Sequence, residues 1–193
     1  MGAQSNRPTT DRVREAWAST LVSLVPGGSL ENLRILDAFA GSGALGLELL
    51  SRGALSCVFL EKDKRTLSVL RKNIESLGLT STKAQLALQD TLSPQLSSFI
   101  KHLGPFDLLI LDPPYSLAQS RVQELLAHLV EFQLLQEGSL ISYEHSAATE
   151  EHMDGLLLGA LPSALYLKLV KSKKYGTINL DYYRCCTAVE EER

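Results

Sequence analysis

The stretch LRILDAFAGSGALGLELLSRG, residues 33–53, decides the fold of this 193-residue chain. Residues 33–39 are mostly apolar and predict a buried strand, while residues 44–53 have leucines at the spacing of a helix. Between them three glycines satisfy the pattern G-x-G-x-x-G, at Gly41, Gly43 and Gly46. A strand, a glycine-rich turn and a helix in this order are typical of an α/β protein whose turn backbone approaches a ligand.

Strand and helix patterns alternate along the rest of the chain. Strands are expected at residues 57–62, 83–89, 106–111 and 139–145. Helices are expected from Thr10 to the stop at Pro26-Gly27-Gly28, over the segment that carries Leu67, Leu70, Ile74 and Leu77, and over 93–103, 118–135 and 149–159. Residues 165–171 and 177–183 alternate apolar and polar side chains around Tyr175-Gly176, which indicates an antiparallel hairpin. The sequence therefore predicts an α/β fold with an open, mostly parallel sheet, one antiparallel strand in a C-terminal hairpin and an N-terminal helix.

Composition indicates a single domain over residues 1–193, with a flexible lead at 1–8 and an acidic tail at 186–193. No apolar run approaches the roughly 20 residues of a membrane-spanning helix, and the polar N-terminus lacks a signal or transit pattern. Three cysteines without metal-ligand spacing predict reduced thiols in the cytoplasm and no bound metal. The net charge of −3 argues weakly against a nucleic-acid partner, although lysines gather in the acid-free segment 163–176. We expect a monomer.

The glycine turn and the acid at the end of the next strand indicate an adenosine cofactor. Glu61 follows Gly41 by 20 residues, where a carboxylate can accept hydrogen bonds from both hydroxyls of a ribose. We assign Phe39, Gly41, Ser42 and Gly43 to the same cofactor site. This motif alone does not separate NAD from S-adenosylmethionine, because both carry adenosine.

Two further acids bear on the cofactor. Asp37 precedes the glycines, where its charge would repel a pyrophosphate and stabilise the ammonium and sulfonium of S-adenosylmethionine; a turn-capping role is the alternative. Asp90 ends the third strand and can accept the exocyclic amine of adenine, while Thr91 or Leu92 covers the ring. Helix N-capping is the competing role for Asp90.

The segment LDPPY, residues 111–115, follows a buried strand and points to chemistry on an amine. The Asp112 carboxylate and the Pro113 carbonyl can accept both protons of a planar amine, and Pro113 and Pro114 fix these acceptors in advance. Tyr115 supplies an aromatic face for an unstacked base. The segment therefore predicts an amine clamp beside the glycine turn, at the switch point of the sheet. A strand-terminating turn with an incidental aromatic residue is the alternative.

Three motifs resemble the RsmD-like family of bacterial 16S ribosomal RNA guanine-N2 methyltransferases: RPTTDRVRE (7–15), LDAFAGSGALGLELLSRGA (36–54) and LDPPY. The resemblance implies a class I methyltransferase fold, S-adenosylmethionine as donor, S-adenosylhomocysteine as product, and a guanine of 16S rRNA or of a small-subunit assembly particle as acceptor. It also places Arg7, Thr10 and Arg12 beside cofactor or RNA. Only MGAQSN precedes Arg7, where family members usually have a Gly- and Arg-rich hairpin that adds to RNA docking.

Several alternatives stay open. The acceptor amine can instead be adenine N6, cytosine N4 or a protein glutamine, and the fold also suits an NAD-dependent oxidoreductase or a non-catalytic RNA-binding protein. Lys173, Lys174 and Tyr175 form a turn that is suited to RNA phosphate or base stacking, although simple exposure explains them equally well. We expect the histidines to be structural or on the surface, and one of Tyr182 and Tyr183 to face solvent.

Overall fold

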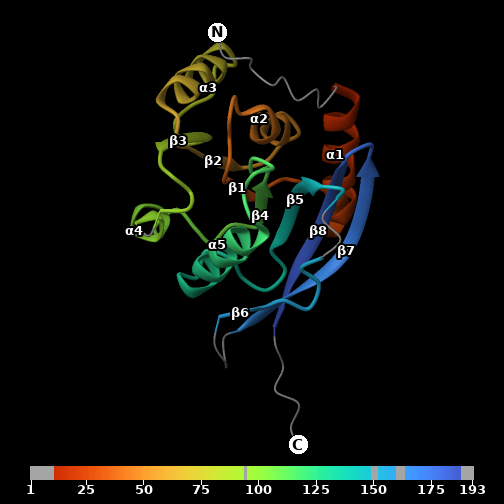
Figure 1. Ribbon diagram of the computed structural model, residues 1–193. Coiled ribbons are helices and arrows are strands. Elements are labelled where there is room, and N and C mark those ends of the chain that lie inside the picture. The colour runs from red at the N-terminus through yellow and green to blue at the C-terminus, as the bar shows by residue number, and fades with distance from the viewer. Residues whose placement is uncertain (1–10, 94, 149–151, 160–163, 188–193) are drawn as a thin grey trace, which may run out of the picture.

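The computed structural model describes residues 11–93, 95–148, 152–159 and 164–187. Its centre is an eight-stranded sheet with the order β3-β2-β1-β4-β5-β8-β7-β6 (Figure 1). The strands are β1 (Arg34–Asp37), β2 (Ser56–Glu61), β3 (Ala84–Leu88), β4 (Leu108–Leu111), β5 (Leu140–Ser146), β6 (Leu157–Leu158), β7 (Leu165–Tyr175) and β8 (Ile178–Thr187). The helices are α1 (Asp11–Leu24), a 3₁₀ turn η1 (Pro26–Gly28), α2 (Ala44–Ser51), α3 (Lys64–Ser76), α4 (Leu96–Ile100) and α5 (Gln119–Glu131).

Strand direction confirms the predicted mostly parallel sheet. The strands β1 to β5 run in one direction. The chain places β2 and then β3 on one side of β1, and it places β4 and β5 on the other side. The strand β8 is antiparallel to β5, and β7 pairs with β8 as the predicted hairpin. A switch point therefore lies between β1 and β4, where ligands of open α/β sheets bind.

Helices cover both faces of the sheet (Figure 1). One face is packed by α1, α2 and α3, with Trp17, Leu49 and Leu70 fully or almost fully buried, and the other face is packed by α4 and α5. The indole Nε1 of Trp17 donates a hydrogen bond to Ser142 Oγ at 2.8 Å, which fixes α1 against β5. The carboxyl ends of β1, β4 and β5 are thus held rigidly at one edge of the sheet.

The prediction of a helix at 149–159 is wrong for the residues of this segment that the structure describes. Residues 149–151 lie outside that range, and 152–159 contain turns and the short strand β6. The Gly155 N–H donates to the Leu167 carbonyl at 2.7 Å, and the Leu167 N–H donates to the Leu156 carbonyl at 3.0 Å. The segment therefore pairs with the edge of β7, which satisfies backbone groups that a sheet edge would expose.

The expectation that one of two neighbouring tyrosines faces solvent is also wrong. Tyr182 and Tyr183 both have 0% exposed surface, although their side chains point to opposite faces of β8. Tyr182 packs in the core cluster that contains α1, and Tyr183 packs with Met153 in the other cluster. The segment 152–159 therefore closes a face that the sequence pattern left open.

The alternation of side chains between the two faces of the sheet is interrupted partway along β7 in the β7–β8 hairpin. A register shift between Leu169 and Lys171 adds one residue, Val170, to β7. Leu169 packs with the cluster under α5, whereas Val170 packs with the cluster under α1. Beyond this bulge, Lys171 pairs with Tyr182 and shares its face of the sheet.

Candidate active site

The glycine turn follows β1 and opens α2, as predicted. Gly43 has φ +84°, and a Cβ atom there would lie 2.1 Å from Leu70 Cδ1. A Cβ atom on Gly46 would lie 2.4 Å from Phe59 Cε1, so this glycine lets α2 pack closely on β2. Close packing therefore requires two of the three glycines, whereas Gly41, with φ +53°, has open space at its Cβ position and lines the ligand side of the turn.

Glu61 is held in place by the turn that it faces. Its Oε2 atom accepts a hydrogen bond from the Gly41 N–H at 3.0 Å, and its Oε1 atom accepts one from the Asp63 N–H at 2.7 Å. A carboxylate has about four lone-pair sites, so each oxygen can still accept a ligand hydroxyl. The side chain is thus preorganised to accept two hydroxyls without losing rotamer freedom on binding.

A cleft of about 400 Å³ lies between the glycine turn and the segment after β4. It brings together many of the predicted site residues, namely Phe39, Gly41, Glu61, Asp90, Thr91, Asp112 and Pro114. The lining also includes Lys62, Leu92 and Leu117. A volume of this size suits a nucleoside-sized ligand.

Asp90 and Thr91 are positioned by local hydrogen bonds. Asp90 Oδ1 accepts from the Leu92 N–H at 3.0 Å, so this carboxylate closes a turn at the cleft and does not cap α4, which begins at Leu96. Thr91 is buried, and its hydroxyl donates to the Ala38 carbonyl. This bond ties the rim after β3 to the turn after β1.

Asp37 does not line the cleft. It is 1% exposed, and its Oδ2 atom accepts from the Gly46 N–H at 3.2 Å, which is the turn-capping contact. Its Oδ1 atom has no hydrogen-bond partner among the residues that the structure describes. Burial raises the pKa of Asp37 to about 7; the backbone N–H of Gly46 opposes this, and the nearby charges of Asp112 and Glu61 add to it. Any effect of Asp37 on a ligand therefore acts through charge.

The segment LDPPY follows β4 at the same edge of the sheet. Asp112 lines both the cleft and a small neighbouring pocket under α1, so it stands between the two. Pro113 is buried and Pro114 lines the cleft. The ring of Tyr115 is 47% exposed, while its hydroxyl donates to Glu144 Oε1 at 3.2 Å. The geometry thus presents a fixed aromatic face beside Asp112.

Glu144 was not predicted as a site residue. It lies within β5, in the buried run SLISYEH, and only 6% of its surface is exposed. It lines the small pocket under α1 together with Asp112 and Trp17. An acid inside an otherwise buried strand was the available signal, because charged residues are rarely buried without a partner.

Other predicted residues lie away from the cleft or outside the described range. Arg7 and Thr10 lie outside the residues that the structure describes. Ser42 and Gly43 do not line the cleft, and Arg12 is exposed on α1. Lys173 Nζ donates to Thr20 Oγ1 at 2.8 Å, Lys174 is exposed, and Tyr175 packs partly against the core. The hairpin turn is nevertheless at the same edge as the clamp, because Ile178 pairs with Ser146 at the carboxyl end of β5.

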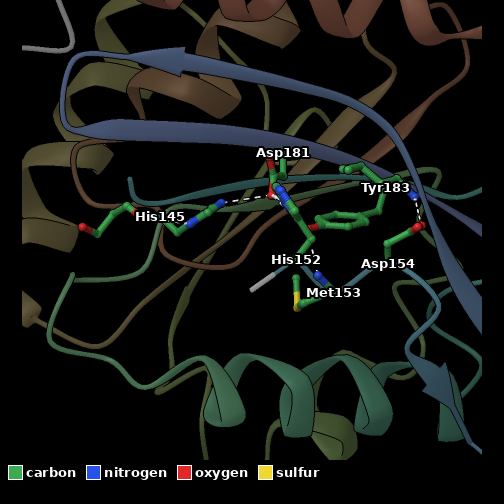
Figure 2. Close-up of polar contacts among 8 residues, drawn as sticks. His145, His152, Met153, Asp154, Asp181 and Tyr183 are labelled. Atoms are coloured by element: carbon green, nitrogen blue, oxygen red, sulfur yellow. Dashed lines mark hydrogen bonds and ion pairs between the residues drawn. The ribbon is translucent and has the colours of Figure 1, made fainter. Parts of the chain in front are cut away.

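A second polar cluster joins β5, β8 and the segment before β6 (Figure 2). His145 Nε2 and His152 Nδ1 lie 3.0 Å and 2.8 Å from Asp181 Oδ2, and the Tyr183 hydroxyl donates to the same oxygen at 3.0 Å. Burial raises the pKa of Asp181, but hydrogen bonds from the two histidines, Ser172 and Tyr183 outweigh it and hold this pKa well below its usual range. The cluster fastens the 152–154 segment to the sheet, and it gives His145 a structural role.

Among the described residues, no group of three or more histidines, cysteines or acids has the geometry of a metal site. Within the same part of the chain, no helix has the length and apolar composition needed to cross a membrane.

The strand order, the switch point and the cleft beside it define a class I methyltransferase with a Rossmann-like fold. The chain belongs to the RsmD-like family: its residues 1–184 match the family model described as Conserved hypothetical protein 95. The Bacillus subtilis protein YlbH is 36% identical over 181 residues, which cover 93% of this chain and 88% of YlbH.

Two further relatives agree with this assignment. Ribosomal RNA small subunit methyltransferase D of Haemophilus influenzae is 33% identical over 147 residues, which cover 75% of this chain and 70% of that protein. The crystal structure of HI0767 from Haemophilus influenzae has a TM-score of 0.66 at 30% identity and covers 93% of this chain and 99% of that chain.

Proposed function

We propose that this protein transfers a methyl group from S-adenosylmethionine to the exocyclic N2 amine of a guanine in 16S ribosomal RNA. The observation that carries the proposal is the position of Asp112, which lines both the nucleoside-sized cleft and the small pocket under α1 that Glu144 also lines. A donor in the cleft and an amine on the clamp would meet at this residue. Relatives named ribosomal RNA small subunit methyltransferase D support ribosomal RNA of the small subunit as substrate.

The residues of the cleft fit S-adenosylmethionine. Glu61 suits the ribose hydroxyls, and Asp90 suits the exocyclic amine of adenine. Three carboxylates, at Glu61, Asp90 and Asp112, line the cleft, and Lys62 is the only basic residue among the described ones that do. The buried Asp37 adds further negative charge behind the turn when it is ionised. This environment favours a ligand with a sulfonium and an ammonium over a dianionic pyrophosphate, and therefore over NAD.

The clamp supports the transfer by positioning and electrostatics. S-adenosylmethionine, when bound, supplies a methyl group that its sulfonium makes electrophilic. The Asp112 carboxylate and the Pro113 carbonyl accept the two N–H groups of the amine, which aims its lone pair at the methyl carbon. The new C–N bond forms as the C–S bond breaks, and the surplus proton leaves to Asp112 or to solvent. Tyr115, whose hydroxyl is bound by Glu144, holds the base by stacking.

The first experiment tests the cofactor by thermal unfolding. S-adenosylhomocysteine at 100 times its Kd should stabilise the protein by about 2.7 kcal/mol, whereas NADH at the same concentration should leave the unfolding temperature unchanged. Stabilisation by NADH alone would support the oxidoreductase alternative and reject the proposal.

The second experiment tests the acceptor in cells. Mass spectrometry of 16S rRNA from a deletion strain should show the loss of one N2-methylguanine. The wild-type gene and a control variant at an exposed acid on α3, Glu75→Ala, should restore it, and Asp112→Ala should not. Unchanged rRNA in the deletion strain, or methylation of naked DNA by the purified protein, would overturn the assignment.

A further inference from the structure

We propose that Glu144 selects guanine by accepting the N1–H of the base while the clamp holds its N2 amine. This inference rests on the proposed function and extends it, since the clamp alone does not distinguish guanine from other bases that carry a planar amine. Glu144 therefore acts in the selection of the base and takes no part in the transfer of the methyl group to the amine.

Strand register places Glu144 beside the clamp. Leu111 of β4 pairs with Tyr143 of β5, so the next residues along the two parallel strands, Asp112 and Glu144, are neighbours. Neighbouring strands lie about 4.8 Å apart, and paired side chains of parallel strands point to the same face. Both carboxylates line the small pocket under α1. Two acceptors on adjacent strands are therefore directed to one place.

The residues that precede Glu144 on β5, and its register partner on β8, carry no charge. The adjacent Tyr143 and Ser142 are both almost fully buried, and Leu180 is the register partner of Glu144 on β8. An apolar side chain would fill this site without the cost of burying a carboxylate. Glu144 Oε1 accepts the Tyr115 hydroxyl at 3.2 Å, and the carboxylate has further lone pairs for a second donor. The acid is thus fixed in orientation, next to the ring on which the base would stack.

The donor pattern of guanine matches two adjacent acceptors. Guanine presents N1–H and the N2 amine side by side on its Watson–Crick edge, whereas adenine N1 and cytosine N3 present lone pairs. With the N2 amine on Asp112 and Pro113, the neighbouring N1–H is directed at the next acceptor along the sheet edge, which is Glu144. A lone pair in the same place would face a buried carboxylate, and a site built for a donor rejects an analogue that lacks it. Glu144 therefore supplies the discrimination that the clamp lacks.

The test replaces the target guanine by 2-aminopurine, which keeps the N2 amine but carries a lone pair at N1. Small-subunit particles are reconstituted with either base at the mapped nucleotide. The rate of methylation of each particle is then measured with the wild-type protein and with Glu144→Gln. The wild type should prefer guanine by at least about 100-fold. The glutamine amide can turn its N–H towards N1, so Glu144→Gln should reduce this preference to below about 10-fold while the thermal shift by S-adenosylhomocysteine stays unchanged.

Two controls separate this role from simpler ones. Tyr115→Phe removes the hydroxyl that orients Glu144 but keeps the ring and the carboxylate, so it should reduce the preference between the two bases less than Glu144→Gln does. Glu124→Gln, an exposed acid on α5, should behave as the wild type.

The outcomes that would overturn the inference are distinct from failure of the proposed function. An unchanged preference in Glu144→Gln, or weaker binding of S-adenosylhomocysteine by this variant, would reject the role of Glu144. Absence of guanine methylation by the wild-type protein would instead reject the proposed function.

Discussion

Replacement of the buried acid behind the glycine turn, Asp37→Asn, should change how the stability of the protein depends on pH. The asparagine Oδ1 can still accept the Gly46 N–H, which donates to Asp37 at 3.2 Å in the native protein. The variant cannot ionise, however. Its amide nitrogen lies where Asp37 Oδ1 has no partner among the described residues, so a constant cost of about 1–3 kcal/mol is expected at every pH.

The magnitude follows from the pKa of Asp37, which burial raises from 3.8 to about 7. Below pH 3.8 both the folded and the unfolded chain hold the proton, so this group contributes nothing to stability. Between these two values only the unfolded chain releases the proton, and the free energy of unfolding falls as pH rises. At about 1.4 kcal/mol per pH unit, the loss is complete above pH 7 and amounts to about 4 kcal/mol. The difference between variant and wild type should shift by that amount, in favour of the variant, from pH 4 to pH 8.5.

Urea unfolding followed by tryptophan fluorescence provides the assay, because Trp17 is the only tryptophan and is 2% exposed. Asp63→Asn is the matched control, because the pKa of Asp63 is lowered in the folded protein whereas that of Asp37 is raised. Hydrogen bonds from Thr66 lower the pKa of Asp63, so its stabilising effect exists above pH 3.8 and disappears as pH falls. The Asp63 variant should therefore keep a constant difference from the wild type between pH 5 and pH 8.5. Parallel stability profiles for Asp37→Asn and the wild type over that range would refute the reasoning.

Two further predictions concern packing and acid stability. Gly46→Ala places a Cβ atom 2.4 Å from Phe59 Cε1, so its free energy of unfolding should fall by about 1–3 kcal/mol in urea; no loss would show that α2 can move away from β2. For Asp181, burial raises the pKa, but hydrogen bonds from His145 and other donors lower it further, so this carboxylate stabilises the folded state above pH 3.8 and loses its effect as pH falls. Asp181→Asn should have a lower free energy of unfolding than the wild type at pH 7, and this free energy should change less between pH 5 and pH 2. Unfolding followed by near-UV circular dichroism measures both, and equal stability of the two proteins at pH 7 would contradict this account.

The parts of the fold that local sequence determines were predicted correctly. The glycines after β1 fix a strand, a turn and a helix, because each position requires either a positive φ or the absence of a side chain. The prolines of LDPPY end β4 where the pattern indicates. These two signals give the switch point of the sheet, and hence the place of the cleft. The lining of the cleft by Glu61 and Asp90 then follows from strand order.

The parts that depend on distant contacts could not be predicted. The residues Thr149, Glu150 and Glu151 are a typical start of a helix in the sequence, but Gly155 and the open edge of β7 direct the described part of that segment into the sheet. Tyr183 packs in one core cluster with Met153 of this segment, whose N–H donates to the Tyr183 hydroxyl at 3.1 Å. Asp37 has the same sequence context whether it faces a ligand or the N-terminus of α2, and only packing decides between them.

The bulge in β7 has a consequence for changes in the length of the hairpin. Leu169 and Lys171 pair with the consecutive residues Tyr183 and Tyr182, so pairing with β8 fixes the face of Lys171 and, two residues on, that of Lys173, which donates to Thr20 on α1. Deletion of Val170 would restore regular pairing and leave every side chain between the bulge and the turn on its present face. The bulge therefore absorbs a one-residue difference in length between the two strands of the arm, and the core at its base keeps its register.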